Sequence, residues 1–113
     1  MPGRVRPKVV DKPWGREVWY AVTDRYAGKV LEVNAGHQLS LQYHERKHET
    51  WMLYSGLMEV TLGDERFELA PGEAVEVPPG VVHRMRAIAD SVLLEVSTPD
   101  LDDVVRVEDD YGR

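Results

Sequence analysis

The sequence predicts a small all-β domain built from antiparallel strands, and three observations support this. Turn-forming residues, mostly Gly, Pro, Asn and Asp, recur about every ten residues. The segments between these turns are short and rich in Val, Leu, Trp and Tyr. No stretch of ten or more residues shows a convincing helical period. Short strands at even spacing are typical of β-sandwiches and β-barrels. The chain, 1–113, is therefore expected to form one domain, with a barrel core over about 14–98 and an acidic tail over 99–113.

The strand pattern is clearest in the middle of the chain. Residues 57–62 alternate, which places three apolar side chains on one face of a strand, namely Met58, Val60 and Leu62. Gly63-Asp64 then predicts a hairpin turn into a second strand over 66–69. Residues 74–77 alternate in the same way, with one face formed by Val75 and Val77.

Two later segments are less regular. Residues 92–96 form a nearly continuous apolar run, which is typical of a strand buried on both faces. Residues 99–105 give the best helix candidate, because Pro99 and the acidic residues after it favour a helix start. We expect the tail from Asp100 to Arg113 either to pack on the barrel or to reach a neighbouring subunit.

Charge and cysteine content exclude several classes of function. The net charge is −6, and no block of basic residues offers a surface for nucleic acid or a membrane. An anionic substrate would therefore need a local cluster of cations. The chain has no cysteine, which excludes disulfides, thiolate metal ligands and cysteine nucleophiles. The N-terminus lacks a long apolar run, so we expect no signal peptide and a cytoplasmic location.

Four side chains are predicted to bind one divalent metal ion. Gln42 and His44 are two residues apart, so on a strand they share one face. Glu49 follows after a charged turn, and His83 comes after the Pro78-Pro79-Gly80 corner. If both strand pairs meet in a barrel, two imidazoles, a carboxylate and an amide oxygen converge on one point. This donor set suits Mn, Fe, Co, Ni or Zn, and it leaves coordination positions open for substrate.

The same residues lie in two motifs that resemble those of the cupin superfamily. The first motif, G-x5-H-x-H-x4-E-x6-G, matches from Gly36 to Gly56, with Gln42 in place of the first His. The second motif, G-x5-P-x-G-x2-H, matches from Gly72 to His83. This resemblance implies a small antiparallel jelly-roll β-barrel with the metal ion inside it.

Nearly the whole chain resembles the isomerase domain of type II phosphomannose isomerases, a family that often carries a mannose-1-phosphate guanylyltransferase domain upstream. The resemblance runs from Lys12-Pro13-Trp14-Gly15 to the closing Tyr111-Gly112-Arg113. Around the metal the family usually reads Q-M-H-x-H-R-x-E-H-W. Four residues of this chain depart from that pattern: Tyr43, Arg46, Lys47 and Thr50. The metal positions are kept, whereas the surroundings that choose the substrate are kept only in part.

The resemblance implies a metal-dependent mannose-6-phosphate isomerase, which interconverts an aldose and a ketose through an enediol. Four basic residues are candidates for binding the substrate: Arg46, Lys47, Arg84 and Arg113. Solvated surface charge is the alternative for the first three, and a frayed terminus is the alternative for the fourth. Because Arg84 adjoins His83 on a strand, a bulge would be needed for it to reach the metal. The nearest candidates in sequence for the catalytic base are Glu45 and His48.

Three other functions stay open at this point. The metal could be bound but catalytically idle, or the protein could be an oxygen-using cupin with Fe, Ni or Mn. A non-catalytic sugar-binding or regulatory module is the third alternative. Small all-β domains carry exposed strand edges, so we also expect a homodimer that forms through edge strands or tails.

Overall fold

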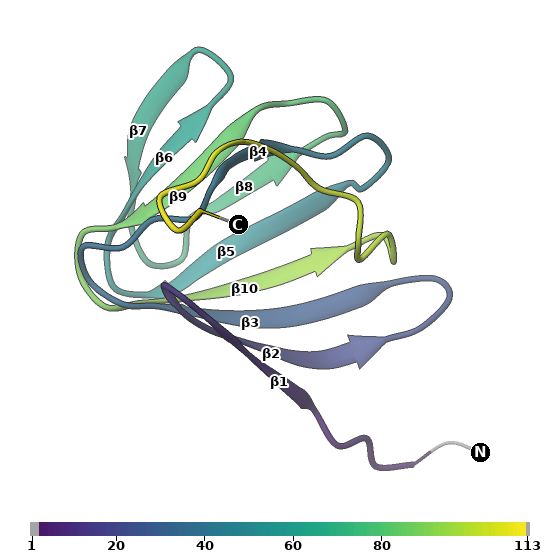
Figure 1. Ribbon diagram of the computed structural model, residues 1–113. Coiled ribbons are helices and arrows are strands. Elements are labelled where there is room, and N and C mark those ends of the chain that lie inside the picture. Colours follow the sequence, from purple (N-terminus) through teal and green to yellow (C-terminus); the bar gives the residue numbers. More distant parts are fainter. Residues whose placement is uncertain (1–2, 113) are drawn as a thin grey trace.

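The computed structural model describes residues 3–112, which form two antiparallel sheets and no helix. The larger sheet has six strands in the order β1-β2-β3-β10-β5-β8, and the smaller sheet has five in the order β11-β4-β9-β6-β7. The predicted all-β antiparallel jelly-roll fold is confirmed (Figure 1). The strands are β1 (Lys8–Lys12), β2 (Gly15–Val22), β3 (Ala27–Val33), β4 (Leu41–Tyr43), β5 (Glu49–Ser55), β6 (Met58–Leu62), β7 (Glu65–Leu69), β8 (Ala74–Val77), β9 (His83–Ala87), β10 (Ser91–Ser97) and β11 (Val105–Glu108).

The two sheets face each other across a core of alternating apolar side chains. Leu53, Met58, Val60 and Leu93 are each 0% exposed. Met58 and Val60 belong to the alternating strand predicted over 57–62, and the predicted hairpin is β6–β7. Complete burial of one such side chain stabilises the fold by about 1.5–3 kcal/mol. The core therefore fixes the two sheets relative to each other.

The inner face of the large sheet changes from apolar to charged along its strands. The pairing of β10 with β3 places Leu93 opposite Leu31 and, two residues further along, Glu95 opposite Lys29. All four side chains are buried. Successive inward positions on a strand are two residues apart, so the charged pair continues the same inner face as the apolar pair. The apolar core thus gives way, along the strands, to a buried polar site.

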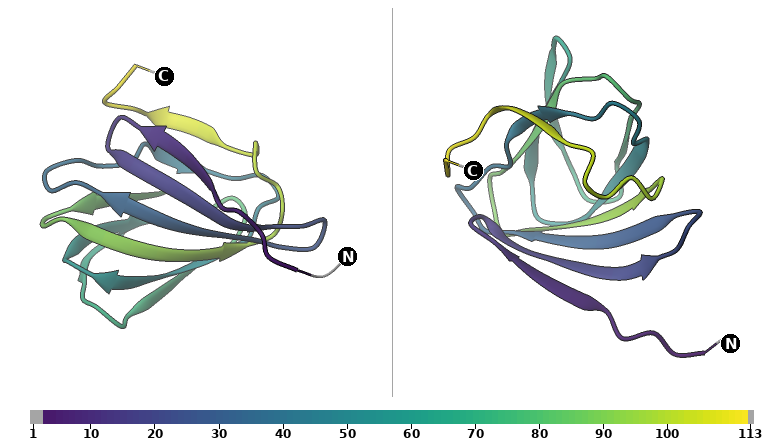
Figure 2. Two further views of the ribbon diagram at one scale, coloured as in Figure 1. Left: turned by 90° about the horizontal axis from the view of Figure 1, so that it is seen from below. Right: turned by 45° about the vertical axis from the view of Figure 1, so that its right-hand side comes forward.

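The prediction that residues 92–96 form a strand buried on both faces is wrong. These residues belong to β10, where Leu93 and Glu95 are buried whereas Val96 is 55% exposed. Side chains of a strand point alternately to its two faces, and the small sheet covers only the inner face of the large one (Figure 2). The apolar run therefore contributes partly exposed side chains to the outer face of the large sheet.

The helix considered for residues 99–105 does not form. A turn occupies residues 101–102, and β11 begins at Val105. The Asp103 carboxylate instead accepts three hydrogen bonds, at 3.0, 2.6 and 2.8 Å, from the backbone N–H groups of Glu45, Arg46 and Lys47. Short acidic side chains that bond the backbone in this way compete with helix formation.

The tail packs on the barrel, which is one of the two predicted alternatives. We call residues 98–112 the C-terminal strap. Its strand β11 pairs with β4 at the edge of the small sheet, and the Tyr111 hydroxyl lies 2.7 Å from His37 Nδ1. At the edge of the large sheet lies β1, which precedes the predicted start of the core at residue 14. The described residues contain no helix that could cross a membrane.

Candidate metal centre

Three of the predicted metal ligands meet inside the barrel. His44 directly follows β4, Glu49 opens β5 and His83 opens β9. Their side chains are 3%, 2% and 1% exposed, and one ligand atom from each lies within 4.8 Å of the others. The backbone N–H of Gly80, in the corner before His83, donates to the His44 carbonyl at 2.7 Å. Two segments that are distant in the sequence are thereby held together at the site.

Both imidazoles are oriented by backbone carbonyls. His44 Nδ1 lies 2.5 Å from the Asp103 carbonyl oxygen, and His83 Nδ1 lies 2.9 Å from the Val81 carbonyl oxygen. A carbonyl only accepts, so each Nδ1 carries a proton, and each Nε2 of the neutral ring keeps a free lone pair.

The two Nε2 atoms then face a carboxylate oxygen. They are buried without a hydrogen-bond partner among residues 3–112, and they lie 3.5 Å (His44) and 3.1 Å (His83) from Glu49 Oε1. Lone pairs that face a carboxylate repel it unless positive charge lies between them. Backbone-anchored imidazoles are also how proteins orient metal-binding histidines. These residues therefore fit a divalent cation.

Gln42, the predicted fourth ligand, lies beside this cluster. Its partner across β4 and β9 is His83, so both side chains extend to the same face of the small sheet. Gln42 Oε1 accepts a 2.6 Å hydrogen bond from Ser40 Oγ. An amide oxygen has two lone pairs, so one remains for a cation. The role of Gln42 as a ligand stays a prediction.

Lys47 links the cluster to a second buried carboxylate. Its Nζ lies 2.9 Å from Glu49 Oε2 and 3.2 Å from Glu95 Oε2. Burial alone would lower the pKa of Lys47, but Glu95 and Glu49 raise it above its usual value. Burial alone would raise the pKa of Glu49, but the Lys47 ammonium holds that pKa below its usual range. Glu49 is therefore held as a carboxylate, the form that binds a metal.

The pKa of Glu95 is shifted in the opposite direction to that of Glu49. Burial, together with the negative charge of Glu49, raises the pKa of the Glu95 carboxyl above its usual value, although Lys47 and Lys29 oppose the shift. Two carboxylates that share one ammonium thus differ in basicity, and Glu95 is the more basic. Glu95 does not belong to the metal-binding cluster.

A second buried ion pair lies on the neighbouring strands. Lys29 Nζ lies 3.6 Å from Glu17 Oε1 and 4.4 Å from the centre of a Trp19 ring. Trp19 Nε1 donates to the same Glu17 oxygen at 2.8 Å. Three of the residues that line the cavity, Glu17, Lys29 and Glu95, are not among the site residues predicted from the sequence. The signal for Lys29 was a charge at an inward position of a strand whose alternate residues Ala27, Leu31 and Val33 are apolar, and the signal for Glu95 was a charge within the apolar run 92–96.

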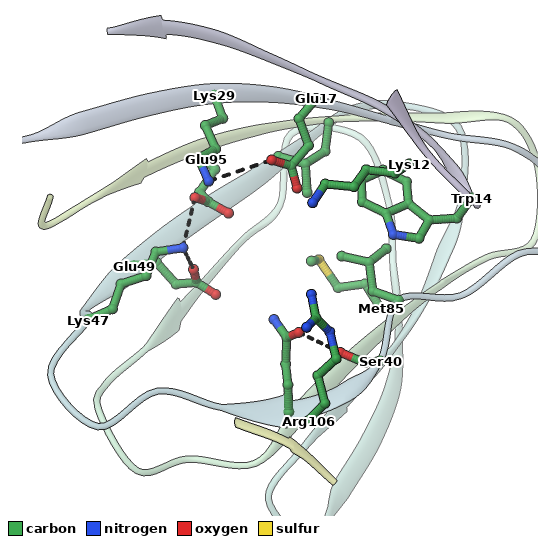
Figure 3. Close-up of a pocket in the computed structure, with 13 residues that line it drawn as sticks. Lys12, Trp14, Glu17, Lys29, Ser40, Lys47, Glu49, Met85, Glu95 and Arg106 are labelled. Atoms are coloured by element: carbon green, nitrogen blue, oxygen red, sulfur yellow. Dashed lines mark hydrogen bonds and ion pairs between the residues drawn. The ribbon is translucent and has the colours of Figure 1, made fainter. Parts of the chain in front are cut away.

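These side chains line an inner cavity of about 60 Å³, which adjoins an outer cleft of about 630 Å³. Figure 3 shows Lys12 and Arg106 extending into the inner cavity from two different strands. The cavity is lined by four cations, Lys12, Lys29, Lys47 and Arg106, and by three carboxylates, Glu17, Glu49 and Glu95. The wall therefore carries an excess of positive charge in a chain of net charge −6.

The predicted base candidates and one predicted cation lie away from the cluster. The His48 side chain is exposed, with Nε2 2.7 Å from Glu76 Oε2. Glu45 and Arg46 are exposed residues of the same turn. Of the predicted substrate-binding residues that the structure describes, only Lys47 lines the inner cavity.

Arg84 extends from the face of β9 opposite to that of His83. Its Nε donates to the Leu39 carbonyl at 3.0 Å, and its guanidinium lies 3.7 Å from the Glu108 carboxylate. The pairing of β9 with β6 keeps one register through this position, so the bulge that Arg84 would need to reach the metal is not there. The fourth candidate, Arg113, lies outside the described residues.

An antiparallel jelly roll with a buried His-Glu-His cluster defines a protein of the cupin class. More narrowly, the chain belongs to the family described as mannose-6-phosphate isomerase C-terminal, whose sequence profile matches residues 5–109. This confirms the resemblance inferred from the two motifs.

Relatives of similar sequence and a solved structure of similar fold support this family assignment. The xanthan biosynthesis protein XanB of Xanthomonas campestris pv. campestris (strain B100) is 38% identical over 92% of this chain and 23% of XanB. The alginate biosynthesis protein AlgA of Pseudomonas aeruginosa is 34% identical over 92% of this chain and 23% of AlgA. The chain thus spans less than a quarter of the length of these relatives. The solved structure of KdgF from Halomonas sp. has a TM-score of 0.75 at 24% identity and covers 81% of this chain and 86% of that one, which shows a shared fold.

Proposed function

We propose that the protein is a metal-dependent sugar-phosphate isomerase of the mannose-6-phosphate type, which interconverts an aldose and a ketose through an enediol. The observation that carries this proposal is the buried cluster of His44, Glu49 and His83, whose two Nε2 atoms lack hydrogen-bond partners within residues 3–112. Membership of the mannose-6-phosphate isomerase C-terminal family supports a phosphorylated sugar as the substrate.

The metal would be held by His44, Glu49 and His83, with Gln42 as the fourth ligand. Two neutral imidazoles, a carboxylate and an amide oxygen suit Mn, Fe, Co, Ni or Zn. If bound, such an ion would polarise the carbonyl and the adjacent hydroxyl of the open-chain sugar, and would thereby acidify the C–H bond of the hydroxyl-bearing carbon next to the carbonyl.

Glu95 is our candidate for the group that moves the proton between the neighbouring carbons. It is 5% exposed and lines the inner cavity, but it is not a member of the metal cluster. Its raised pKa makes it a stronger base than an ordinary carboxylate. Lys47, at 3.2 Å, holds the Glu95 carboxylate in place. The earlier candidates Glu45 and His48 have less support, because both are exposed.

The direct test is the interconversion of mannose 6-phosphate and fructose 6-phosphate by purified protein loaded separately with Mn, Co, Ni, Zn or Fe. His44→Ala and His83→Ala are the controls, and both should lose bound metal and activity together. Absence of turnover with every ion would refute the isomerase proposal. Metal analysis of the same samples would still report whether the cluster binds a cation.

We further propose that the protein acts as a homodimer and works in the cytoplasm. The contact expected from the sequence, through edge strands or tails, stays a prediction. We propose the outer face of the large sheet instead, because its exposed residues include Tyr54 (66%) and Val96 (55%). Light scattering on the wild type should give twice the chain mass. Val96→Glu should shift the protein toward the monomer, because it puts a charge into the proposed contact. A monomeric wild type at micromolar concentration would contradict the dimer.

A further inference from the structure

Two cations that line the inner cavity have no partner within the part of the chain that the structure describes. Among residues 3–112, neither the Lys12 ammonium nor the Arg106 guanidinium makes a hydrogen bond or an ion pair. The other two cations of the cavity are neutralised, because Lys29 pairs with Glu17 and Lys47 pairs with Glu49 and Glu95. The unbalanced positive charge of the cavity therefore resides on Lys12 and Arg106.

The two cations come from opposite edges of the barrel. Lys12 is the last residue of β1, the edge strand of the large sheet, and Arg106 lies in β11, the edge strand of the small sheet. Both side chains line the inner cavity as well as the outer cleft, and Figure 3 shows both reaching the same space. Like charges that share a space without an intervening anion repel each other.

The carboxylates of the cavity wall are already engaged by other donors: Glu17 by Lys29 and Trp19, and Glu49 and Glu95 by Lys47. Gln42 adds a further donor. Gln42 Oε1 is engaged by Ser40, so the amide NH₂ of Gln42 is the end without a partner in the described chain. Arg106 offers a planar fork of N–H groups, and Lys12 offers a point charge. These are the two side-chain types that bind phosphate, the first in a bidentate manner.

We propose that Lys12 and Arg106 form a phosphate-binding site that closes the barrel between its two edge strands. The ligand class is a phosphate monoester, with the phosphoryl group between Lys12 and Arg106 and the rest of the molecule directed toward the metal cluster. The choice of a sugar phosphate as the natural ligand rests on the proposed function, whereas the phosphate site itself does not.

The first test is calorimetric binding of inorganic phosphate, mannose 6-phosphate and mannose to the wild type and to Lys12→Met and Arg106→Gln. Loss of one charge-assisted contact should weaken binding of both phosphates by about 10- to 100-fold. The control is Arg66→Gln, which removes one positive charge from an exposed position of β7, and it should bind phosphate as the wild type does. Mannose should bind alike to every variant.

The second test uses stability and does not depend on activity. Without an anion, Lys12→Met should raise Tm, because it relieves repulsion with Arg106. Added phosphate should raise the Tm of the wild type and have a smaller effect on Lys12→Met. Phosphate affinity that is unchanged in both variants, or a wild type that binds no phosphate at millimolar concentration, would overturn the site. Phosphate binding without isomerisation of mannose 6-phosphate would refute the proposed function and leave this site standing.

Discussion

Substitution of Lys47 by Met tests the buried charge network, because this ammonium is shared by two buried carboxylates. The side chains of Lys47, Glu49 and Glu95 are 7%, 2% and 6% exposed. Removing one member of such a network leaves uncompensated buried charge, which costs about 3–5 kcal/mol. In a domain of this size 1 kcal/mol corresponds to about 4 °C. The Tm of Lys47→Met should therefore fall by about 12–20 °C.

Thermal and urea unfolding would be followed by circular dichroism in the presence of a chelator, so that no ion compensates Glu49. Lys8→Met is the matched control. Lys8 is exposed, with its Nζ 5.1 Å from the centre of a Trp19 ring, and its loss should change the free energy of unfolding by less than about 0.5 kcal/mol.

The double variant Lys47→Met/Glu95→Gln separates this explanation from a simple packing defect. It removes one of the two orphaned charges, and we expect it to recover about half of the lost stability. The loss in Lys47→Met should also shrink as the pH falls toward 5. Without Lys47 the folded pKa of Glu95 lies further above its unfolded value, so the cost appears as the pH rises and is relieved when the carboxyl takes up a proton. A loss below about 1 kcal/mol, or no recovery in the double variant, would refute the reasoning.

Four further predictions concern the same site. Asp103→Ala should weaken Zn²⁺ or Mn²⁺ binding about 10- to 100-fold in a competition titration, because the strap would no longer hold the residue 103 carbonyl against His44. The control is Asp102→Ala at the neighbouring exposed position, which should bind the metal as the wild type does. Although burial opposes it, backbone N–H groups lower the pKa of Asp103 from 3.8 to about 2. The stabilisation by this carboxylate is therefore lost as the pH falls from about 4 to 2, and the stability profile of Asp103→Ala should be flatter there. Glu95→Gln should lower kcat for mannose 6-phosphate by at least about 100-fold without loss of bound metal. Zn²⁺ at about 100 times its Kd should stabilise the chelator-treated wild type by about 2.7 kcal/mol and leave the Tm of His83→Ala unchanged.

The sequence was most informative where the required residues lie in short motifs. Local features of the sequence predict the observed cluster, namely the spacing of His44 and Glu49 and the corner that precedes His83. The alternation of side chains along a strand also predicts that Arg84 lies on the face opposite to that of His83, because neighbours on a strand point to opposite faces. The same argument places His48 outside, since it adjoins the inward-facing Glu49.

The cavity wall could not be predicted in the same way. Lys12 and Arg106 are separated by most of the chain, and only the order of strands in the two sheets brings their edges together. Glu95 lies in an apolar run, which predicts a strand buried on both faces and gives no indication of a charged inner face. Tertiary pairing decides such positions, and local pattern carries little information about it.

The orientation of both metal-binding imidazoles rests on main-chain oxygen atoms, from Asp103 for one ring and Val81 for the other. Every amino acid supplies such an atom, whatever its side chain. Apart from Asp103, whose carboxylate holds the strap in place, residues of the loops around the ion can therefore exchange side chains, and with them substrate preference, while both rings keep their orientation. Departures such as Tyr43 and Thr50 are compatible with an intact coordination site for this reason.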